Sequence, residues 1–388
     1  MRDRVILLLA AASLVAAGCG GSGHKAAPAA PPAARPPAPP TGVNFFTEGW
    51  STDWSKHSVP YSQFFSGGPQ RDGIPPIDHP KVVPIAKMRV ALDDRAPVMV
   101  VQQRRAVRAY PLEILVWHEI VNDVLGGRPI AVTYCPLCNS ALVFDRRLGG
   151  RTLTFGTTGN LRNSDLVMWD RQTESWWQQF TGEAVVGTFT GRRLTALPSE
   201  TLSWGAFKRR YPGGTVLSLN TGFDRPYGEN PYAGYERDPS PSSFFTGKAD
   251  ASLPAKERVA AVFTGGRPLV IPFSKLRRSP VVEAQSGATP VAVFYDPHVR
   301  SVLDSTHVSR SIEVGTATAF DRRVGGRTLD FAPRGGGLFV DQQTGSTWDI
   351  TGSAVSGRLR GRQLRPIRHD EQFWFALAAF VPHARILR

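Results

Sequence analysis

Short runs of β-branched and aromatic residues, separated by glycine-containing turns, dominate the chain from about residue 96 onward. In the first part of this region the runs are 98–102, 130–134, 141–145, 166–170 and 216–219. Runs of this length between turn residues predict strands, and the Gly-Gly pairs at 149–150 and 325–326 predict hairpin turns. Two helices are expected here, over 112–121 and over 201–210. The pattern predicts a β-rich α+β fold of mostly short antiparallel strands.

This pattern of strands and turns occurs twice along the chain. The sequence ALVFDRRLGGRTL at 141–153 recurs as ATAFDRRVGGRTL at 317–329, and motifs on either side follow in the same order. The unit is too long for a solenoid repeat, so we predict two tandem copies of one domain, each with about two helices. The first copy is expected over 96–219 and the second over 258–388.

Two further segments flank the copies. Residues 43–95 are expected to form an N-terminal extension that packs on the domain. Residues 220–257 are rich in Pro, Gly, Tyr and Phe and show no period, which predicts a segment that wraps over the surface between the copies.

The first 42 residues carry targeting features. Arg2 and Arg4 precede an apolar stretch over 5–17 that is too short to span a bilayer, which is typical of a signal peptide. The stretch ends in small residues before Cys19 and resembles a lipobox, so residues 1–18 are predicted to be removed and Cys19 to be lipidated. An ordinary signal peptide is the alternative. Residues 19–42 are rich in Pro and Ala and predict a semi-rigid tether. We therefore expect an exported, membrane-anchored lipoprotein on the extracytoplasmic side of the bacterial cell membrane.

The charge balance is strongly basic. The 46 Lys and Arg residues exceed the 32 Asp and Glu residues, which gives a formal net charge of +14. No basic stripe interleaved with aromatic residues is present, so nucleic acid is not an expected partner. For an exported protein, the expected partners of this charge are anionic components of the envelope, such as lipid headgroups or cell-wall polymers.

The differences between the two copies separate structure from chemistry. Trp177 recurs as Trp348 and is expected to be structural, because both copies need the same core. In contrast, the Cys-Pro-Leu-Cys sequence at 135–138 corresponds to Asp-Pro-His-Val at 296–299, so that only the first copy carries thiols. We predict that the first copy is functional and the second degenerate.

Two other features are confined to the first copy. His118 has Ser279 as its counterpart, and the polar loop at 156–165 faces a shorter, Gly-rich stretch at 332–337. The candidate residues of this loop are Asn160, Arg162, Asn163 and Asp165. Turn formation is the alternative role for the loop residues, and packing as a half-buried helix residue is the alternative for His118.

Cys135 and Cys138 have only each other or a bound ligand as partners if Cys19 carries lipid. A disulfide here would close a very short ring and stabilise the fold by only about 2 kcal/mol. Thiol-disulfide exchange would need a helix N-terminus to stabilise the thiolate, whereas 141–145 predicts a strand. A turn between strands that presents two thiolates is typical of a metal site, and soft sulfur ligands favour copper or zinc. His118, Asp123 or Met168 could complete such a site. The Cys-x-x-Cys spacing alone leaves a structural disulfide, a redox pair and a metal site open as alternatives.

Several long motifs resemble one protein family. TYCPLCN at 133–139, GGPQRDGIP at 67–75, HEIVND at 118–123, LVMWD at 166–170 and TGFDRPY at 221–227 are similar to the uncharacterised domain-of-unknown-function family 3179. The resemblance spans about 49–388 and implies an exported or membrane-attached bacterial or archaeal protein with no assigned activity.

No GxSxG, HExxH or Walker motif is present, so the sequence leaves enzymatic activity undecided. The resulting hypothesis is a lipid-anchored envelope protein whose dithiolate site binds Cu or Zn. The alternatives are a thiol-disulfide redox protein and a non-enzymatic envelope scaffold with a structural disulfide.

Overall fold

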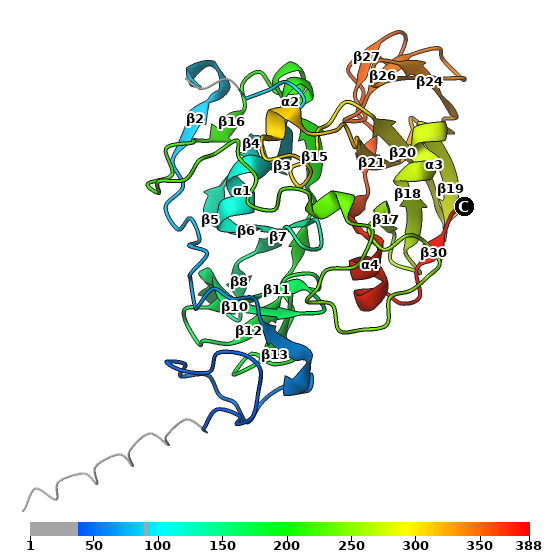
Figure 1. Cartoon of the computed structure of the whole chain (residues 1–388). Coiled ribbons are helices and arrows are strands. Elements are labelled where there is room, and N and C mark those ends of the chain that lie inside the picture. Colours follow the sequence, from blue (N-terminus) through cyan, green and yellow to red (C-terminus); the bar gives the residue numbers. More distant parts are fainter. Residues whose placement is uncertain (1–37, 89–91) are drawn as a thin grey trace, which may run out of the picture. The chain divides into compact units, whose positions relative to one another are not determined.

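The computed structural model describes residues 38–88 and 92–388 (Figure 1). The expected signal peptide, Cys19 and most of the tether lie outside the described residues. Within the described part, no helix is both long and apolar enough to cross a bilayer.

Four short α-helices are present in the described chain, and strands make up most of the remaining regular structure. The helices are α1 (Leu112–His118), α2 (Trp204–Arg210), α3 (Phe273–Arg278) and α4 (Trp374–Phe380). Single 3-10 turns are η1 (Tyr61–Gln63), η2 (Ile85–Lys87), η3 (Tyr235–Arg237) and η4 (Val308–Arg310). The predicted β-rich α+β fold is confirmed.

The two helices expected from the sequence are shorter than predicted. The first ends at His118, because Glu119 has a φ of 57° and turns the chain into a strand. The second begins at Trp204, where the Ser203 side chain accepts a hydrogen bond from the backbone N–H of Ala206. Residues 201–203 belong instead to a strand. In both cases a local cap sets the boundary, which the apolar spacing does not show.

Three sheets and a hairpin form the first half of the fold, which contains residues 96–219 and strands from the preceding segment. The first sheet has the order β15 (Glu200–Ser203), β3 (Pro97–Gln103), β4 (Ala106–Pro111), β16 (Thr215–Leu217), β2 (Val82–Pro84). The second has the order β14 (Ala196–Leu197), β7 (Ser140–Asp145), β6 (Arg128–Cys135), β5 (Ile120–Leu125). The third has the order β1 (Phe64–Ser66), β10 (Phe155–Arg162), β11 (Asp165–Asp170), β12 (Trp176–Gln178), β13 (Glu183–Val186). The hairpin consists of β8 (Arg147–Leu148) and β9 (Arg151–Thr152).

The second half, residues 258–388, has three sheets and a hairpin in the same chain order. The first sheet is β29 (Arg368–Phe373), β17 (Arg258–Phe263), β18 (Leu269–Pro272), β30 (Arg385–Ile386). The second is β28 (Arg365–Pro366), β21 (Thr316–Asp321), β20 (Thr289–Asp296), β19 (Val281–Ser286). The third is β24 (Phe331–Gly335), β25 (Leu338–Asp341), β26 (Thr347–Asp349), β27 (Ala354–Ser356). The hairpin consists of β22 (Arg323–Val324) and β23 (Arg327–Thr328).

The strand orders of the two halves therefore correspond sheet by sheet. In each half one parallel pair occurs among otherwise antiparallel neighbours, β4 with β16 and β18 with β30. This correspondence gives each position of one half a topological equivalent in the other. Descent of the halves from one duplicated domain stays a prediction.

The halves meet through the strands β15 and β29, each of which stays paired within the sheet of its own half. Strand β29 of the second half lies against β7 of the first, and β15 of the first half lies against β21 of the second. One hydrophobic core is shared across this contact and contains side chains from α1, β6, β17 and α4. The helix that follows each of these strands also contacts the opposite half: Phe380 of α4 stacks on Phe180, and Arg210 of α2 donates to Gln363.

One predicted loop is regular structure. The polar stretch at 156–165 forms most of β10, a two-residue turn and the start of β11. Its residues are paired in the strand ladder, with Leu161 opposite Phe65 and Arg162 opposite Asp165. The expectation of an irregular loop is wrong, because the strands β1 and β11 on either side supply the backbone partners that a polar sequence does not reveal.

Candidate metal centre

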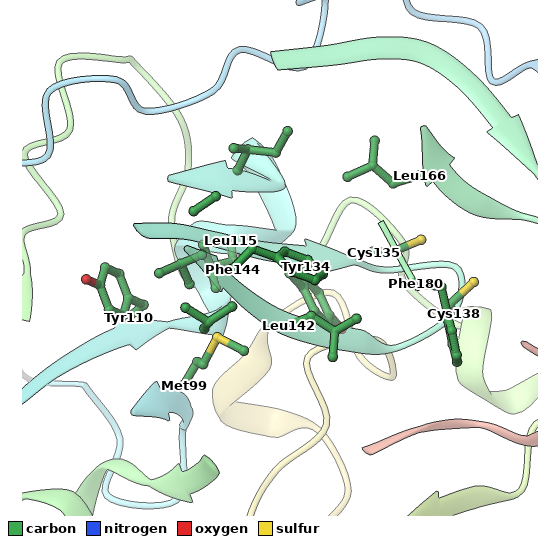
Figure 2. Close-up of a cluster of buried hydrophobic side chains, with 14 of the residues drawn as sticks. Met99, Tyr110, Leu115, Tyr134, Cys135, Cys138, Leu142, Phe144, Leu166 and Phe180 are labelled. Atoms are coloured by element: carbon green, nitrogen blue, oxygen red, sulfur yellow. The ribbon is translucent and has the colours of Figure 1, made fainter. Parts of the chain in front are cut away.

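The two cysteines lie at the end of the β6–β7 hairpin, where Figure 2 shows both sulfur atoms beside the turn. Cys135 is the last residue of β6 and pairs with Ser140, the first residue of β7. The backbone N–H of Asn139 donates to the carbonyl of Pro136 over 3.1 Å and closes the turn. Asn139 adopts a φ of 49°, which asparagine tolerates better than most residues. A strand, a tight turn and a second strand thus present both thiols, as the sequence predicts.

The turn is held from outside by two other parts of the chain. The Tyr235 hydroxyl donates to the carbonyl of Leu137 over 2.7 Å. The backbone N–H of Phe373, at the end of β29, donates to the carbonyl of Cys138 over 2.9 Å. These bonds fix the carbonyl groups of Leu137 and Cys138, so the turn is held by the segment between the halves and by strand β29 of the second half.

Asp165 joins the two cysteines from the β10–β11 hairpin. One donor atom each from Cys135, Cys138 and Asp165 lies within 4.8 Å of the others, and all three side chains are buried. The Oδ2 atom of Asp165 accepts hydrogen bonds from Gln178 Nε2 at 2.5 Å and from the backbone N–H of Phe180 at 2.9 Å. Its Oδ1 atom has no hydrogen-bond partner. The aspartate is therefore held by one oxygen and offers the other.

Burial controls the protonation of these three groups. It raises the pKa of Cys135 and raises the pKa of Cys138 well above its ordinary value. Burial also raises the pKa of Asp165 to about 7, although the hydrogen bonds from Gln178 and Phe180 act to lower it. Both thiols therefore stay protonated at neutral pH, and a bound cation would have to displace these protons.

Unpartnered polar atoms are concentrated at the same hairpin. Both amide atoms of Asn160, the Ser164 hydroxyl and Oδ1 of Asp165 are buried without a hydrogen-bond partner. Each such atom costs about 1–3 kcal/mol when it stays unpaired. Ser164 also has a φ of 66°, which is unusual for a residue other than glycine. Buried polar groups of this kind are usually partnered by an ordered water, an ion or a ligand.

A small cavity lies beside this cluster. It has a volume of about 100 Å³, and its lining includes Glu119, Leu137, Asn160, Leu166 and Tyr232. Leu137 stands between the two cysteines, and Leu166 follows the aspartate, so the cavity borders both hairpins of the site. Burial and the negative charge of Asp165 raise the pKa of Glu119 to about 8. The space is large enough for a few water molecules or a small ligand.

Helix α4 of the second half packs on residues next to the site. Phe380 stacks on Phe180 with ring centroids 4.7 Å apart, and the Arg162 guanidinium lies 5.7 Å from the Phe380 ring centroid. Arg162 also donates to Gln63 Oε1 at 2.8 Å and to Gln178 Oε1 at 3.2 Å. Because Gln178 in turn donates to Asp165, Arg162 helps to hold the aspartate in place through Gln178.

The structure does not bring His118 into the cluster. Its Nδ1 atom lies 2.8 Å from the carbonyl of Pro75, and its Nε2 atom lies 2.6 Å from the Tyr227 hydroxyl. Both ring nitrogens are therefore occupied, in a buried position that ties helix α1 to two distant segments. The other sequence candidates also lie elsewhere: Asp123 pairs with Arg108 and accepts from Tyr110, and Met168 packs in the core.

The polar loop residues divide into separate roles. Asp165 belongs to the cluster, Asn160 lines the cavity, and Asn163 occupies the hairpin turn with a φ of 51°. Sequence reasoning missed Glu119 and Gln178. The equivalent of Gln178 in the second half is Asp349, so a residue-by-residue comparison of the halves contains a signal for that one.

Comparisons with known proteins define the family alone. A family model described as "Protein of unknown function (DUF3179)" matches residues 71–384. Neither the curated proteins nor the solved structures contain a match at the threshold applied.

Proposed function

The chain belongs to the DUF3179 family, and we propose that it binds a transition metal ion, preferentially Zn²⁺, through Cys135, Cys138 and Asp165. The observation that carries the proposal is the convergence of these three donor atoms within 4.8 Å in a buried site. The β6–β7 hairpin and the β10–β11 hairpin belong to different sheets, and both contribute to the cluster. The cluster is therefore a product of the tertiary fold.

The state of the thiols favours metal binding over disulfide exchange. Exchange needs a thiolate with a lowered pKa and access for a second thiol. Burial instead raises the pKa of both Cys135 and Cys138, and both side chains are at most 1% exposed. A metal ion supplies the positive charge that a buried thiolate requires.

The third donor favours zinc over copper. Two thiolates alone would suit Cu(I), whereas a carboxylate oxygen is a harder ligand that zinc accepts readily. Asp165 offers its unpartnered Oδ1 atom while Oδ2 stays fixed by Gln178 and Phe180. Three protein donors leave one tetrahedral position, and a water from the neighbouring cavity is a suitable fourth ligand.

The proposed place of action follows from the sequence. A lipidated Cys19 and the tether over 19–42 would hold the described unit at the outer face of the membrane, where the metal site would meet envelope metal ions. Occupied thiolates are also protected from the oxidation that free thiols undergo outside the cytoplasm.

Metal analysis of the anaerobically purified protein tests the proposal. We expect about one zinc ion per chain in the wild type and almost none in the Cys135→Ser, Cys138→Ser double variant. Asp165→Asn keeps the shape of the side chain and should weaken zinc affinity about tenfold or more. The matched control is Asp296→Asn, a buried aspartate at the strand position equivalent to Cys135. Equal metal content in the wild type and the double variant would overturn the proposal.

A further inference from the structure

A second, larger cavity lies in the other half of the molecule. It is a cleft of about 760 Å³ between helix α2 of the first half and the sheet β24–β27 of the second. Its lining includes Arg209 and Arg210 from α2, Asp296 from the end of β20, and Asp349 from β26. The volume falls within the range of clefts that hold small-molecule ligands.

The cleft occupies the position that is equivalent to the metal centre. Asp296 ends the eight-residue strand β20, as Cys135 ends the eight-residue strand β6. Helix α2 approaches this place, as helix α4 approaches the metal centre in the first half. The difference lies in one hairpin. The β24–β25 connection is Gly336-Gly337, where the first half has a longer hairpin that carries Asn160 and Asp165. The short hairpin leaves open the space that side chains fill in the first half.

Three arginines line this cleft, and none of them lies within ion-pair distance of a carboxylate among the described residues. Arg209 and Arg362 make no side-chain hydrogen bond or ion pair within the described residues, and Arg210 bonds only the neutral amide of Gln363, over 3.1 Å. The Nε atom of Arg210 is buried and has no partner. Many other arginines of the described chain pair with a carboxylate, for example Arg323 with Asp321 at 2.7 Å. Unpaired guanidinium groups around a cleft favour an oxyanion such as phosphate or carboxylate.

The two carboxylates of the cleft form no ion pair with these arginines within the described residues. Asp349 accepts from the backbone N–H and the hydroxyl of Thr351, at 2.9 and 2.6 Å, through Oδ1. Asp296 accepts from the backbone N–H of His298 through Oδ1 at 3.0 Å. Each carboxylate therefore keeps its Oδ2 atom available as an acceptor for hydroxyl groups. A site that combines oxyanion donors with hydroxyl acceptors matches a sugar that carries an acidic group.

We propose that this cleft binds an anionic sugar, with Arg209, Arg210 and Arg362 on its phosphate or carboxylate and Asp296 and Asp349 on its hydroxyl groups. The ligand class agrees with the strongly basic chain and with an envelope location, where acidic glycans are abundant targets. The binding is independent of the metal centre.

Calorimetric titration of the purified protein at about 0.15 M salt, where weak surface attraction is screened, tests this proposal. The probes are trigalacturonic acid for a carboxylate ligand, glucose 6-phosphate for a phosphate ligand, maltotriose as a neutral sugar and inorganic phosphate as a bare anion. We expect one of the two acidic sugars to bind at least about tenfold more tightly than maltotriose and than inorganic phosphate.

Two variants carry the same loss of charge and separate the cleft from the general surface. The triple variant of the cleft, Arg209→Gln, Arg210→Gln, Arg362→Gln, should weaken binding of the preferred acidic sugar about tenfold or more. The control Arg151→Gln, Arg192→Gln, Arg327→Gln removes three exposed arginines outside the cleft and should change the affinity less than about twofold. Val355→Trp, at an exposed position in the cleft lining, should block binding with no change of charge.

Three results would overturn the proposal. They are equal weakening by both arginine variants, unchanged binding in Val355→Trp, or no acidic sugar bound more tightly than inorganic phosphate. If the cleft arginine variant fails to fold, the Val355→Trp result decides the matter.

Discussion

The two halves of the molecule share the same arrangement of sheets, but the equivalent strands β6 and β20 end in different residues, Cys135 and Asp296. In the first half, the turn after β6 presents two thiols to a buried aspartate, in a site closed by a long hairpin and by Phe380 of helix α4. In the second half, strand β20 ends in Asp296, whose carboxylate lines a wide cleft. The comparison teaches that the sheets set where a site lies, while one hairpin and two turn residues set its chemistry.

The shared scaffold is visible in matching contacts. Trp177 is fully buried and donates its indole N–H to Asp170 over 2.8 Å, and Trp348 donates to Asp341 over 2.9 Å. The turns that follow Asp145 and Asp321 are closed in the same way by Arg147 and Arg323. These pairs have the structural role that their presence in both halves predicts.

The largest expected effect tests whether Trp177 and Trp348 stabilise their two halves equally. Trp177→Ala and Trp348→Ala should each lower the free energy of unfolding by about 3–5 kcal/mol, because each leaves a large cavity and removes the indole hydrogen bond to a buried aspartate. Denaturant unfolding of the metal-free protein measures both. A cost confined to Trp177 would show that the tryptophan serves the metal centre instead of the common core.

A smaller effect sharpens the contrast at the metal centre. Gln178→Ala removes the side-chain hydrogen bond to Asp165 Oδ2 and should weaken zinc affinity by about 10–100-fold. The equivalent change, Asp349→Ala, should leave zinc affinity unchanged. Competition with a chromophoric chelator measures both values. An equal loss in the two variants would mean that the effect comes from general destabilisation.

The hairpins themselves can be compared through two glycines. Gly159 has a φ of 75°, and an added Cβ would lie 1.9 Å from the carbonyl oxygen of Pro69. Gly335 has a φ of 89°, and an added Cβ would meet no atom within 4 Å. Gly335→Ala should lower the free energy of unfolding by about 1–2 kcal/mol, because alanine disfavours the left-handed backbone. Gly159→Ala should cost more, because the backbone must also shift, and it should reduce zinc affinity. Thermal unfolding with and without zinc provides the measurement, and equal costs would contradict the closed packing of the first hairpin.

A final test concerns the pH dependence of the metal-free protein. Burial raises the pKa of Asp165 from 3.8 to about 7, so folding favours the protonated carboxyl. Its stabilising contribution is fully present below about pH 4 and is lost as the pH rises through about 7, with a slope of at most about 1.4 kcal/mol per pH unit. Asp165→Asn should flatten this fall between about pH 4 and 7. Identical pH profiles for Asp165→Asn and the wild type would exclude a buried, protonated Asp165.

Much of the architecture follows from local patterns. The β-branched runs between glycines lie where strands β3, β6, β7 and β11 form, because alternation and turn chemistry act over a few residues. The boundaries of α1 and α2 were less predictable, since Glu119 and Ser203 end or begin a helix through single dihedral angles and caps. The stretch at 156–165 was mistaken for a loop because its strand partners come from distant segments.

The sequence by itself determined that two thiols stand on a turn between strands in only one half, because a Cys-x-x-Cys spacing and its missing counterpart are local facts. Only the tertiary structure decided which groups complete the site. It selected Asp165 over His118 because the β10–β11 hairpin folds back onto the β6–β7 turn, while α1 directs the histidine to Pro75 and Tyr227. Contacts between residues far apart in the chain depend on how sheets pack, and neither composition nor spacing encodes that packing directly.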